Sequence, residues 1–508
     1  MQHNPAVRSL AFQLHKQVLG SRGVSSYRPT AEIPLLRLNT KRKVTAALFA
    51  TAGASTLVYA ALSNIKSAEV GSRDYSSTVK ITDTASHPRN YKMLVADPES
   101  ADTMLKSNET STYLTKGSGN SGILSYHFNQ VASNSPIEDD HVESLTTHQS
   151  TDWAFFGVFD GHSGWTTSDK LKRELVPYVA AALNSSPGRD NVSIKQALQT
   201  GFLNLDTEIV HASAQRVLQG KDIPKAAAVA QLMPALSGSC ALLALYDAAA
   251  QSVHVAVTGD SRAIYARQGA GGWIIKALSE DQTGSTTSEV ARLRAEHPNE
   301  ENVVRNGRIL GGLEPSRAFG DSRYKWSIST QSQIADRFYG RRPPAALVSP
   351  PYVTARPEVT STKINLDEQG FMVMGSDGLY EMLTNEEITE LVVGWKQKFD
   401  PKASASSWLP AFLGSPSPPK IINEDDARSG QKKPHVKSKK QFVYEDDNIA
   451  THIIRNALGG GDTNRLYGLL SLPYPLSRSY RDDISVTVVF FGHDTDRRSE
   501  ATPIKAKL

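Results

Sequence analysis

Apolar runs of strand length recur along the chain, and four of them meet an aspartate at one end. They are residues 155–159 before Asp160, residues 253–257 before Asp260, residues 372–375 before Asp377, and Ile484–Phe491 after Asp482. Short apolar runs that stop at Asp and Gly are typical of buried strands. An Asp-Gly pair alone is foremost a turn signal. Its recurrence at several strand edges instead predicts that these carboxylates meet at one site.

Other stretches carry a helical period. Apolar residues at every fourth position predict a helix over residues 168–183 with one face on a core. A similar pattern predicts a second helix over residues 193–217. Residues 240–246 predict a strand that precedes the run at 253–257 in a meander. Strands and helices therefore alternate through one folded region, which we place at residues 123–492.

The N-terminal residues differ from this region. Residues 1–31 contain Arg and Lys but no Asp or Glu, and their apolar residues fall on one helical face. This composition is typical of a mitochondrial presequence, which we assign to residues 1–43; a disordered basic tail is the alternative. Residues 44–65 are uncharged and long enough to span a bilayer. We expect a transmembrane or sorting segment there, retained or cleaved, rather than a buried helix.

Three further segments lack a clear period. Residues 66–122 are polar and rich in Ser and Thr, which predicts a linker with little structure. Residues 325–351 look irregular, and residues 399–440, with several Pro and Lys, predict a surface insertion. The polar tail 493–508 ends in Ala506-Lys507-Leu508, which resembles the Ser-Lys-Leu peroxisomal signal. A secondary peroxisomal pool is one expectation from this tail, and a chance match is the other.

Composition narrows the chemistry. The chain of 508 residues is 39% hydrophobic and 21% charged, which is typical of a soluble globular protein. A net charge of +4 is small for this length and gives no case for nucleic-acid binding. Cys240 is the only cysteine, so intramolecular disulfides are impossible and thiolate metal sites implausible. We therefore expect any metal ion to be held by oxygen ligands, with a histidine nitrogen as the candidate for an additional ligand.

Carboxylates gathered at a strand edge suit divalent cations. Two neighbouring cations repel each other and need several carboxylates, at least one of them bridging. Asp160 is the candidate bridge, and the other candidate ligands are the Gly161 carbonyl, Asp377, Asp482, Glu138 and Asp139, the last two either as ligands or as holders of bound water. Water between such ions becomes a nucleophile near neutral pH, and a phosphate ester is the substrate that such a pair stabilises best.

His162 stands next to the candidate bridge. An imidazole in that place is suited to protonate the leaving alkoxide of a phosphate ester. The alternative is a structural histidine that orients the site.

Six segments in order resemble one known family. They are Ile137-Glu138-Asp139, Val158-Phe159-Asp160-Gly161-His162-Ser163-Gly164, Gly259-Asp260-Ser261-Arg262, Ser316-Arg317-Ala318-Phe319-Gly320-Asp321, Ser376-Asp377-Gly378-Leu379-Tyr380-Glu381-Met382 and Asp482-Asp483-Ile484-Ser485-Val486. Over residues 123–492 the sequence resembles the metal-dependent type 2C Ser/Thr protein phosphatases. The resemblance implies an α+β fold, a four-layer α/β/β/α sandwich of two antiparallel sheets. It implies two Mg²⁺ or Mn²⁺ ions, with a weaker third ion at Asp260, and His162 as general acid.

One position departs from the family pattern. The family usually has an arginine five residues before the aspartate of Glu-Asp to hold the phosphate, and this chain has Asn134 there. An amide lacks the charged, bidentate fork, so another cation must supply the contact or the affinity must be lower. The same departure occurs in the pyruvate dehydrogenase phosphatase-like branch, which this sequence also resembles in segments such as Tyr324-Lys325-Trp326-Ser327 and Tyr480-Arg481-Asp482-Asp483.

The resemblance to that branch implies a partner and a location. The expected partner is a phosphorylated protein, with the E1 alpha subunit of pyruvate dehydrogenase as the candidate, and no nucleic acid is expected. The expected location is the mitochondrion, in the matrix or at the inner membrane and intermembrane space if residues 44–65 form an anchor. Two other functions stay open: a catalytically weak phosphatase-fold binding or regulatory module, and a two-metal nuclease or phosphodiesterase. Retention of Asp160, His162, Asp377 and Asp482 argues against the first, and the absence of a basic groove argues against the second.

Overall fold

The computed structural model describes residues 76–81, 89–94, 97–117, 119–148, 151–220, 223–399, 419–424 and 441–493. The expected presequence, the expected transmembrane or sorting segment and the Ala506-Lys507-Leu508 tripeptide lie outside these ranges. Within the ranges, no helix combines the length and the apolar character that crossing a membrane requires. Before the main fold, β1 (Ser76–Ile81) and β2 (Arg89–Leu94) pair as an antiparallel hairpin.

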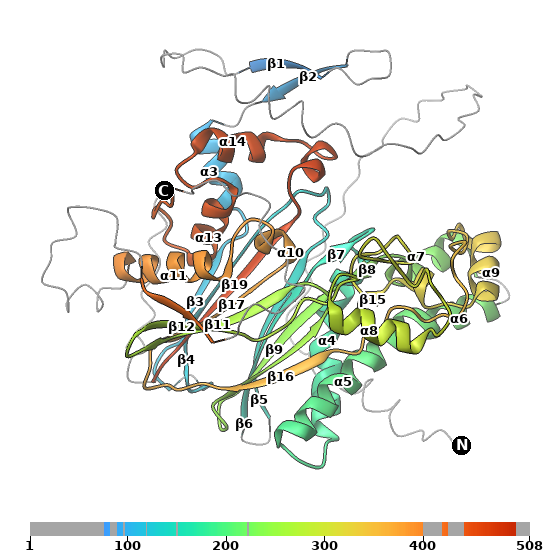
Figure 1. Ribbon diagram of the computed structural model, residues 1–508, viewed down its shortest axis with the longest axis horizontal. Coiled ribbons are helices and arrows are strands. Elements are labelled where there is room, and N and C mark those ends of the chain that lie inside the picture. The colour runs from blue at the N-terminus through green and yellow to red at the C-terminus, as the bar shows by residue number, and fades with distance from the viewer. Residues whose placement is uncertain are drawn as a thin grey trace, which may run out of the picture. The chain divides into compact units, whose positions relative to one another are not determined.

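Two β-sheets form the middle of the fold (Figure 1). The five-stranded sheet has the order β16 (Glu358–Lys363), β10 (Ser252–Thr258), β9 (Ala241–Asp247), β6 (Thr151–Phe159) and β5 (Asp140–His148). The seven-stranded sheet has the order β18 (Ile421–Asn423), β12 (Gly272–Ala277), β11 (Arg262–Gly269), β17 (Gly370–Gly375), β19 (Ile484–Phe491), β4 (Ile123–Val131) and β3 (Thr110–Tyr113). Neighbouring strands in both described sheets are antiparallel, except that β18 runs parallel to β12.

Side chains of the central strands alternate between two cores. On β6, Phe155 and Phe159 enter a cluster shared with the helices on the outer face, whereas Phe156 and Val158 enter the cluster between the sheets. Because both faces are covered, the strand is apolar at nearly every position. Complete burial of each such side chain is worth about 1.5–3 kcal/mol. This explains why the run 155–159 carries no alternating polar signal.

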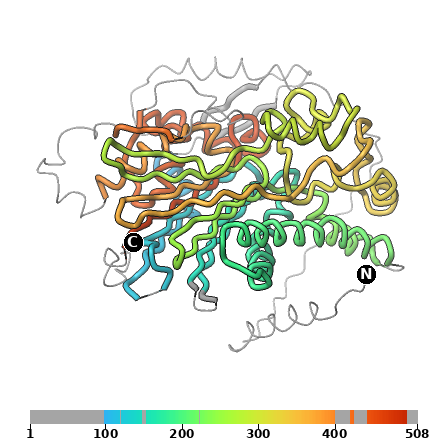
Figure 2. Tube along the Cα trace, turned by 60° about the horizontal axis from the view of Figure 1, so that its bottom comes forward, coloured from blue at the N-terminus to red at the C-terminus, as the bar shows by residue number. Residues whose placement is uncertain are grey.

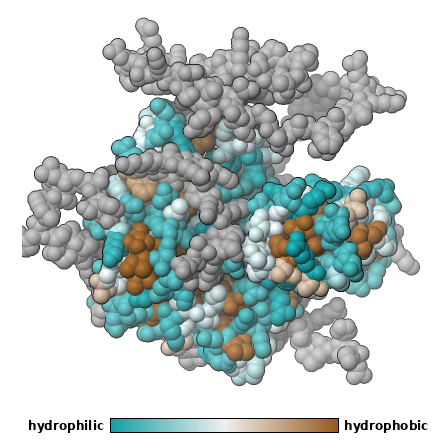
Figure 3. All heavy atoms as spheres, viewed as in Figure 1, coloured by the Kyte–Doolittle hydropathy of each residue, from teal (hydrophilic) through white to brown (hydrophobic). Residues whose placement is uncertain are grey.

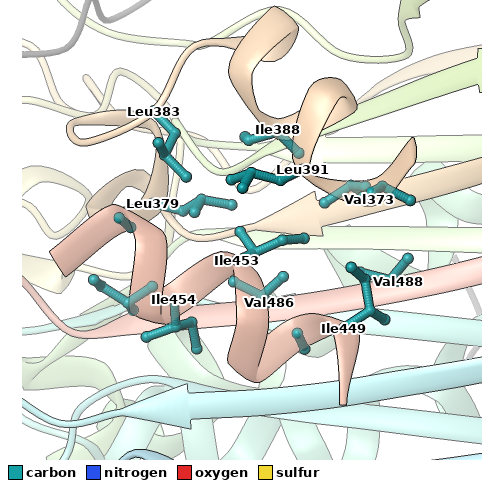
Figure 4. Close-up of a cluster of buried hydrophobic side chains, with 14 of the residues drawn as sticks. Val373, Leu379, Leu383, Ile388, Leu391, Ile449, Ile453, Ile454, Val486 and Val488 are labelled. Carbon is teal, nitrogen blue, oxygen red and sulfur yellow. The ribbon is translucent and has the colours of Figure 1, made fainter. Parts of the chain in front are cut away.

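Helices cover the outer face of each sheet. On the five-stranded sheet lie α4 (Thr166–Asn184), α5 (Asn191–Thr207) and α7 (Lys225–Leu236). On the seven-stranded sheet lie α3 (Pro98–Lys106), α11 (Asn385–Phe399), α13 (Ile449–Leu458) and α14 (Thr463–Ser471). Figure 2 shows the two helical layers on opposite sides of the strands. In Figure 4, Ile449, Ile453 and Ile454 of α13 face Val486 and Val488 of β19. The predicted α+β class and α/β/β/α layering are confirmed.

The helix predicted over residues 168–183 is confirmed as α4. The one predicted over 193–217 begins earlier, at Asn191, where the side chain of Asp190 accepts hydrogen bonds from Val192 N and Ser193 N. It also changes its winding, because a π-helical turn, η1 (Glu208–Ala212), separates α5 from α6 (Ser213–Gln219).

The predicted linker and irregular segment contain more structure than expected. In residues 66–122, α3 buries Ala101 and Leu105 completely, and β3 pairs with β4. In residues 325–351, Ser327 caps α9 (Ile328–Phe338), whose buried side chains include Ile334 and Phe338. Each segment has only one or two buried apolar residues per turn, which is too weak a signal to recognise without its packing partner.

Part of the predicted surface insertion belongs to the sheet. β18 lies within residues 399–440, and its backbone joins β12 through Trp273 N to Lys420 O at 2.8 Å and Glu424 N to Ile275 O at 2.9 Å. Ile421 packs against the core of the seven-stranded sheet, whereas Ile422 is exposed. The insertion therefore contributes an edge strand.

Further described elements form an excursion between β12 and β16. It contains α8 (Thr287–Glu296), the short pair β13 (Val304–Arg305) and β14 (Arg308–Ile309), the 3-10 turn η2 (Ser322–Tyr324), and α9. The excursion has a small core of its own around Leu293, Ile309 and Tyr352. Its surface, like most of the face in Figure 3, is largely hydrophilic with small apolar patches.

We expect Ile421→Ser to lower the free energy of unfolding by about 1–2 kcal/mol, because it removes apolar area from the core edge. Ile422→Ser is the matched control, and its effect should stay within about 0.5 kcal/mol. Urea unfolding of both variants measures the difference. Equal effects would mean that β18 does not pack as described.

Candidate active site

The site begins where β6 ends. The chain leaves Phe159, passes through Asp160 and enters the short strand β7 (Gly161–His162). β7 pairs with β8 (Gly238–Ser239), which pairs in turn with β15 (Phe319–Gly320). Cys240 N donates to Asp160 O at 2.8 Å. These bonds hold the backbone of Asp160 at the rim of the five-stranded sheet.

Three of the predicted carboxylates converge. Asp160, Asp260 and Asp377 each offer an oxygen, and these oxygens lie within 4.8 Å of one another. Asp260 follows β10, and Asp377 begins the short helix α10 (Asp377–Tyr380) after β17. The backbone N of Asp377 donates to Asp160 Oδ2 at 3.2 Å. Residues from both sheets therefore meet at one point.

The electrostatics of this group fit a divalent cation. Burial raises the pKa of Asp160 well above its usual value, and the charges of Asp377, Asp139 and Asp260 add to the rise. Burial and the nearby Asp483 likewise raise the pKa of Asp139. Buried carboxylates that repel one another are stabilised by a positive charge placed between them. The donor set is all oxygen, as Mg²⁺ and Mn²⁺ prefer.

The predicted ligand Asp482 lies beside this group but outside it. Its Oδ1 accepts from Arg478 Nη1, and also from Asp483 N at 2.7 Å. A Cβ built on Gly378, the neighbour of Asp377, would lie 3.2 Å from Asp482 Cβ. Asp482 is thus adjacent to the three-carboxylate group, with its carboxylate paired to an arginine.

Glu138 and Asp139 reach the site on a loop that Asp483 organises. Asp483 Oδ1 accepts from Ser133 N at 2.5 Å and Asn134 N at 2.9 Å. Its Oδ2 accepts from Asn134 Nδ2 at 2.9 Å and Glu138 N at 2.8 Å. Asp139 Oδ2 accepts from Ser485 Oγ at 2.8 Å. The sequence analysis did not assign this role to Asp483. Asp482 and Asp483 are adjacent aspartates directly before β19, and the sequence does not show that their side chains point in different directions.

Gly161 is required by close packing against the same loop. A Cβ at this position would lie 2.0 Å from Glu138 O. Only glycine lets β7 approach the Glu138 carbonyl, which also accepts from Ser168 Oγ at 2.5 Å. The Asp-Gly pair is therefore a packing requirement of the site, beyond its value as a turn signal.

His162 is held by a carboxylate that sequence reasoning did not assign. His162 Nε2 lies 2.6 Å from Asp321 Oδ2. Burial disfavours the imidazolium, but the charge and hydrogen bond of Asp321 outweigh it and raise the pKa of His162. Gly238 makes room for the pair, since a Cβ there would lie 2.2 Å from His162 Nε2. The signal available in the sequence was the matched segment that ends in Asp321.

A buried ion pair supports the loop that carries Asp321. Lys325 Nζ donates to Asp206 Oδ2 at 2.7 Å and to Ala318 O at 2.7 Å. Gly320 N donates to Asp206 Oδ1 at 3.0 Å. Helix α5, which carries Asp206, therefore fixes the position of Asp321 and through it that of His162.

Comparison with known proteins identifies the class. Residues 127–407 match the model of the family described as protein phosphatase 2C. The chain belongs to this family and is a serine/threonine protein phosphatase.

Curated relatives extend the likeness over most of the chain. It is 42% identical to a mitochondrial pyruvate dehydrogenase (acetyl-transferring) phosphatase 1 of Saccharomyces cerevisiae, covering 79% of this chain and 74% of the relative. It is 43% identical to a protein phosphatase 2C homolog of Schizosaccharomyces pombe, covering 74% and 82% respectively. It is 30% identical to a mitochondrial pyruvate dehydrogenase (acetyl-transferring) phosphatase 2 of Homo sapiens, covering 79% and 84%.

We expect Asp321→Asn to lower kcat toward a phosphoserine peptide by about 10- to 100-fold, as His162→Ala should, because the imidazole loses its orienting partner. Turnover of p-nitrophenyl phosphate should fall far less, since its phenolate leaves without a proton. Steady-state kinetics on both substrates measure this contrast.

The matched control is Asp336→Asn, which removes the exposed partner of Arg342 and should change neither rate. Equal losses on the two substrates would contradict a role of Asp321 in positioning a proton donor.

Proposed function

We propose that the chain is a metal-dependent phosphatase of mitochondria that acts on phosphorylated pyruvate dehydrogenase. The observation that supports the metal requirement is the convergence of the buried Asp160 and Asp260 with the half-buried Asp377. The substrate and location are supported by the names of the relatives from yeast and human. The composition of residues 1–43 agrees with the location.

Two Mg²⁺ or Mn²⁺ ions fit the residues present. Asp160, the Gly161 carbonyl, Asp377 and Asp482 would hold them. Glu138 and Asp139 would hold bound water, and Asp260 would contribute to a weaker third ion. When bound, such ions supply a nucleophile derived from water near neutral pH and positive charge for the phosphoryl oxygens.

The chain's own residues perform the remaining tasks. His162 donates a proton to the Oγ of the serine or threonine as that oxygen leaves, because an alkoxide is a poor leaving group. Asp321 keeps the ring oriented and favours the protonated imidazole that this step needs. Asp483 holds the loop of Glu138 and Asp139 against the site. The contacts of Asp321 and Asp483 support these roles.

We expect the purified full chain to release phosphate from phosphorylated pyruvate dehydrogenase with Mg²⁺ or Mn²⁺ and not in EDTA. Asp377→Asn should reduce turnover by about 100-fold or more. Mn²⁺ should raise the melting temperature of the native protein, because it binds the folded state alone, and should raise that of the variant much less.

Without metal the variant should be no less stable than the native protein, because the substitution removes a charge that repels Asp160. Full activity in EDTA would exclude the metal mechanism. Mn²⁺ binding without turnover on any phosphopeptide would instead favour the binding-module alternative.

A further inference from the structure

Most cationic and amide side chains near the carboxylate group are already committed to other partners. Arg262 is buried and binds Asp281 through Nε at 2.9 Å and Nη2 at 2.6 Å. Arg481 is buried, donates from Nε to Leu469 O, and has its pKa lowered to about 10 by burial. The amide of Asn134, at the position of the family arginine, donates to Asp483. Nη1 of Arg481 has no partner among the described residues, but it is buried, as Arg262 is.

Arg478 differs from these residues. Its side chain is 36% exposed, and its Nη1 pairs with Asp482 Oδ1. Within the described residues, Nε and Nη2 of Arg478 have no protein acceptor. One edge of the guanidinium is therefore anchored by Asp482, and the other edge is left without an acceptor among the described residues.

The turn that carries Arg478 is tied to the loop of Glu138 and Asp139. Arg478 lies in η3 (Leu476–Ser479), whose Ser477 is buried and donates from Oγ to Ser133 O at 2.5 Å. Arg481 N closes the turn on Ser477 O at 3.1 Å. Burial and the charge of Asp483 raise the pKa of Glu138, and the positive charge of Arg478 partly offsets this rise. Arg478 is therefore close enough to Glu138 to interact with it electrostatically. The guanidinium is thus held at the edge of the candidate metal centre.

We propose that Arg478 binds the phosphoryl group of the substrate, as the cation that replaces the arginine absent at position 134. A phosphoryl dianion that approaches a group of carboxylates needs cationic donors in addition to metal, and the planar fork of arginine matches its oxygens. The pair with Asp482 orients the fork. It adds little stability, since exposed pairs of this kind contribute little. The inference rests on the proposed phosphatase site.

The test compares Arg478→Gln and Arg478→Lys in the full chain with Mn²⁺. We expect Arg478→Gln to raise both the KM for a phosphoserine peptide and the Ki for inorganic phosphate by about 10- to 100-fold, the loss expected for a charge-assisted hydrogen bond. The kcat should change less than these constants. Arg478→Lys should recover part of the phosphate affinity, because it keeps the charge and loses the fork.

Two further readouts separate phosphate binding from a structural role. The melting temperature of Arg478→Gln should match that of the native protein. Its Mn²⁺ dissociation constant, measured by calorimetry without substrate, should be unchanged or lower, because a positive charge next to the site is removed. Arg173→Gln is the matched control, since Arg173 forms the same type of exposed pair with Asp169 four residues away, and it should change none of these constants.

An unchanged Ki for phosphate in Arg478→Gln would overturn the proposal. A rise in Ki accompanied by lost Mn²⁺ binding or a lower melting temperature would also overturn it and assign Arg478 a structural role. Failure of the proposed function has a different signature. A native protein that acts on phosphopeptides but not on pyruvate dehydrogenase would refute the substrate, and the phosphate constants would still decide the role of Arg478.

Discussion

Mutual repulsion among buried carboxylates is the constraint on which this site depends. Asp160 and Asp260 are buried and Asp377 is half-buried, with oxygens of the three within 4.8 Å of one another, an arrangement that costs free energy without a cation. The fold can hold them because each follows a strand buried on both faces, and the strands are fixed by the core between the sheets. Well-packed interiors resist small displacements. The stability of the sandwich thus maintains an arrangement that the carboxylates alone would not adopt.

A second set of polar residues holds the functional side chains around this carboxylate group in position. Asp483 uses both oxygens to hold the loop before β5, and Asp321 holds His162. Each of the two carboxylates decides where a neighbouring functional residue lies. Partners of this kind orient the groups that do the chemistry. The buried pair of Asp206 and Lys325 extends the same support to α5.

Position 134 shows how one replacement is tied to its surroundings. The side-chain amide of Asn134 donates a hydrogen bond to Asp483. The loop keeps this hydrogen bond, but position 134 lacks the positive charge of an arginine. Arg478 lies on a turn bonded to the same loop through Ser477 and Ser133. A neighbouring segment thus brings a guanidinium to the site from a different part of the sequence. In the role proposed for it, Arg478 supplies the positive charge that Asn134 lacks.

The sequence alone determined the strands that end on carboxylates, the helix over 168–183, and the α+β class, because those signals lie in consecutive residues. It also indicated that Asp160, Asp260, Asp377 and Asp482 meet at one site, and the structure brings the first three together as one group. Only the tertiary structure placed α3 on the core and β3 and β18 at the two edges of the seven-stranded sheet, because their partners lie on strands far along the chain. Only the structure shows that Asp482 pairs with Arg478 while Asp483 holds the loop of Glu138, and that His162 pairs with Asp321. Those choices depend on side-chain direction and on contacts across 159 residues or more, which no local pattern records.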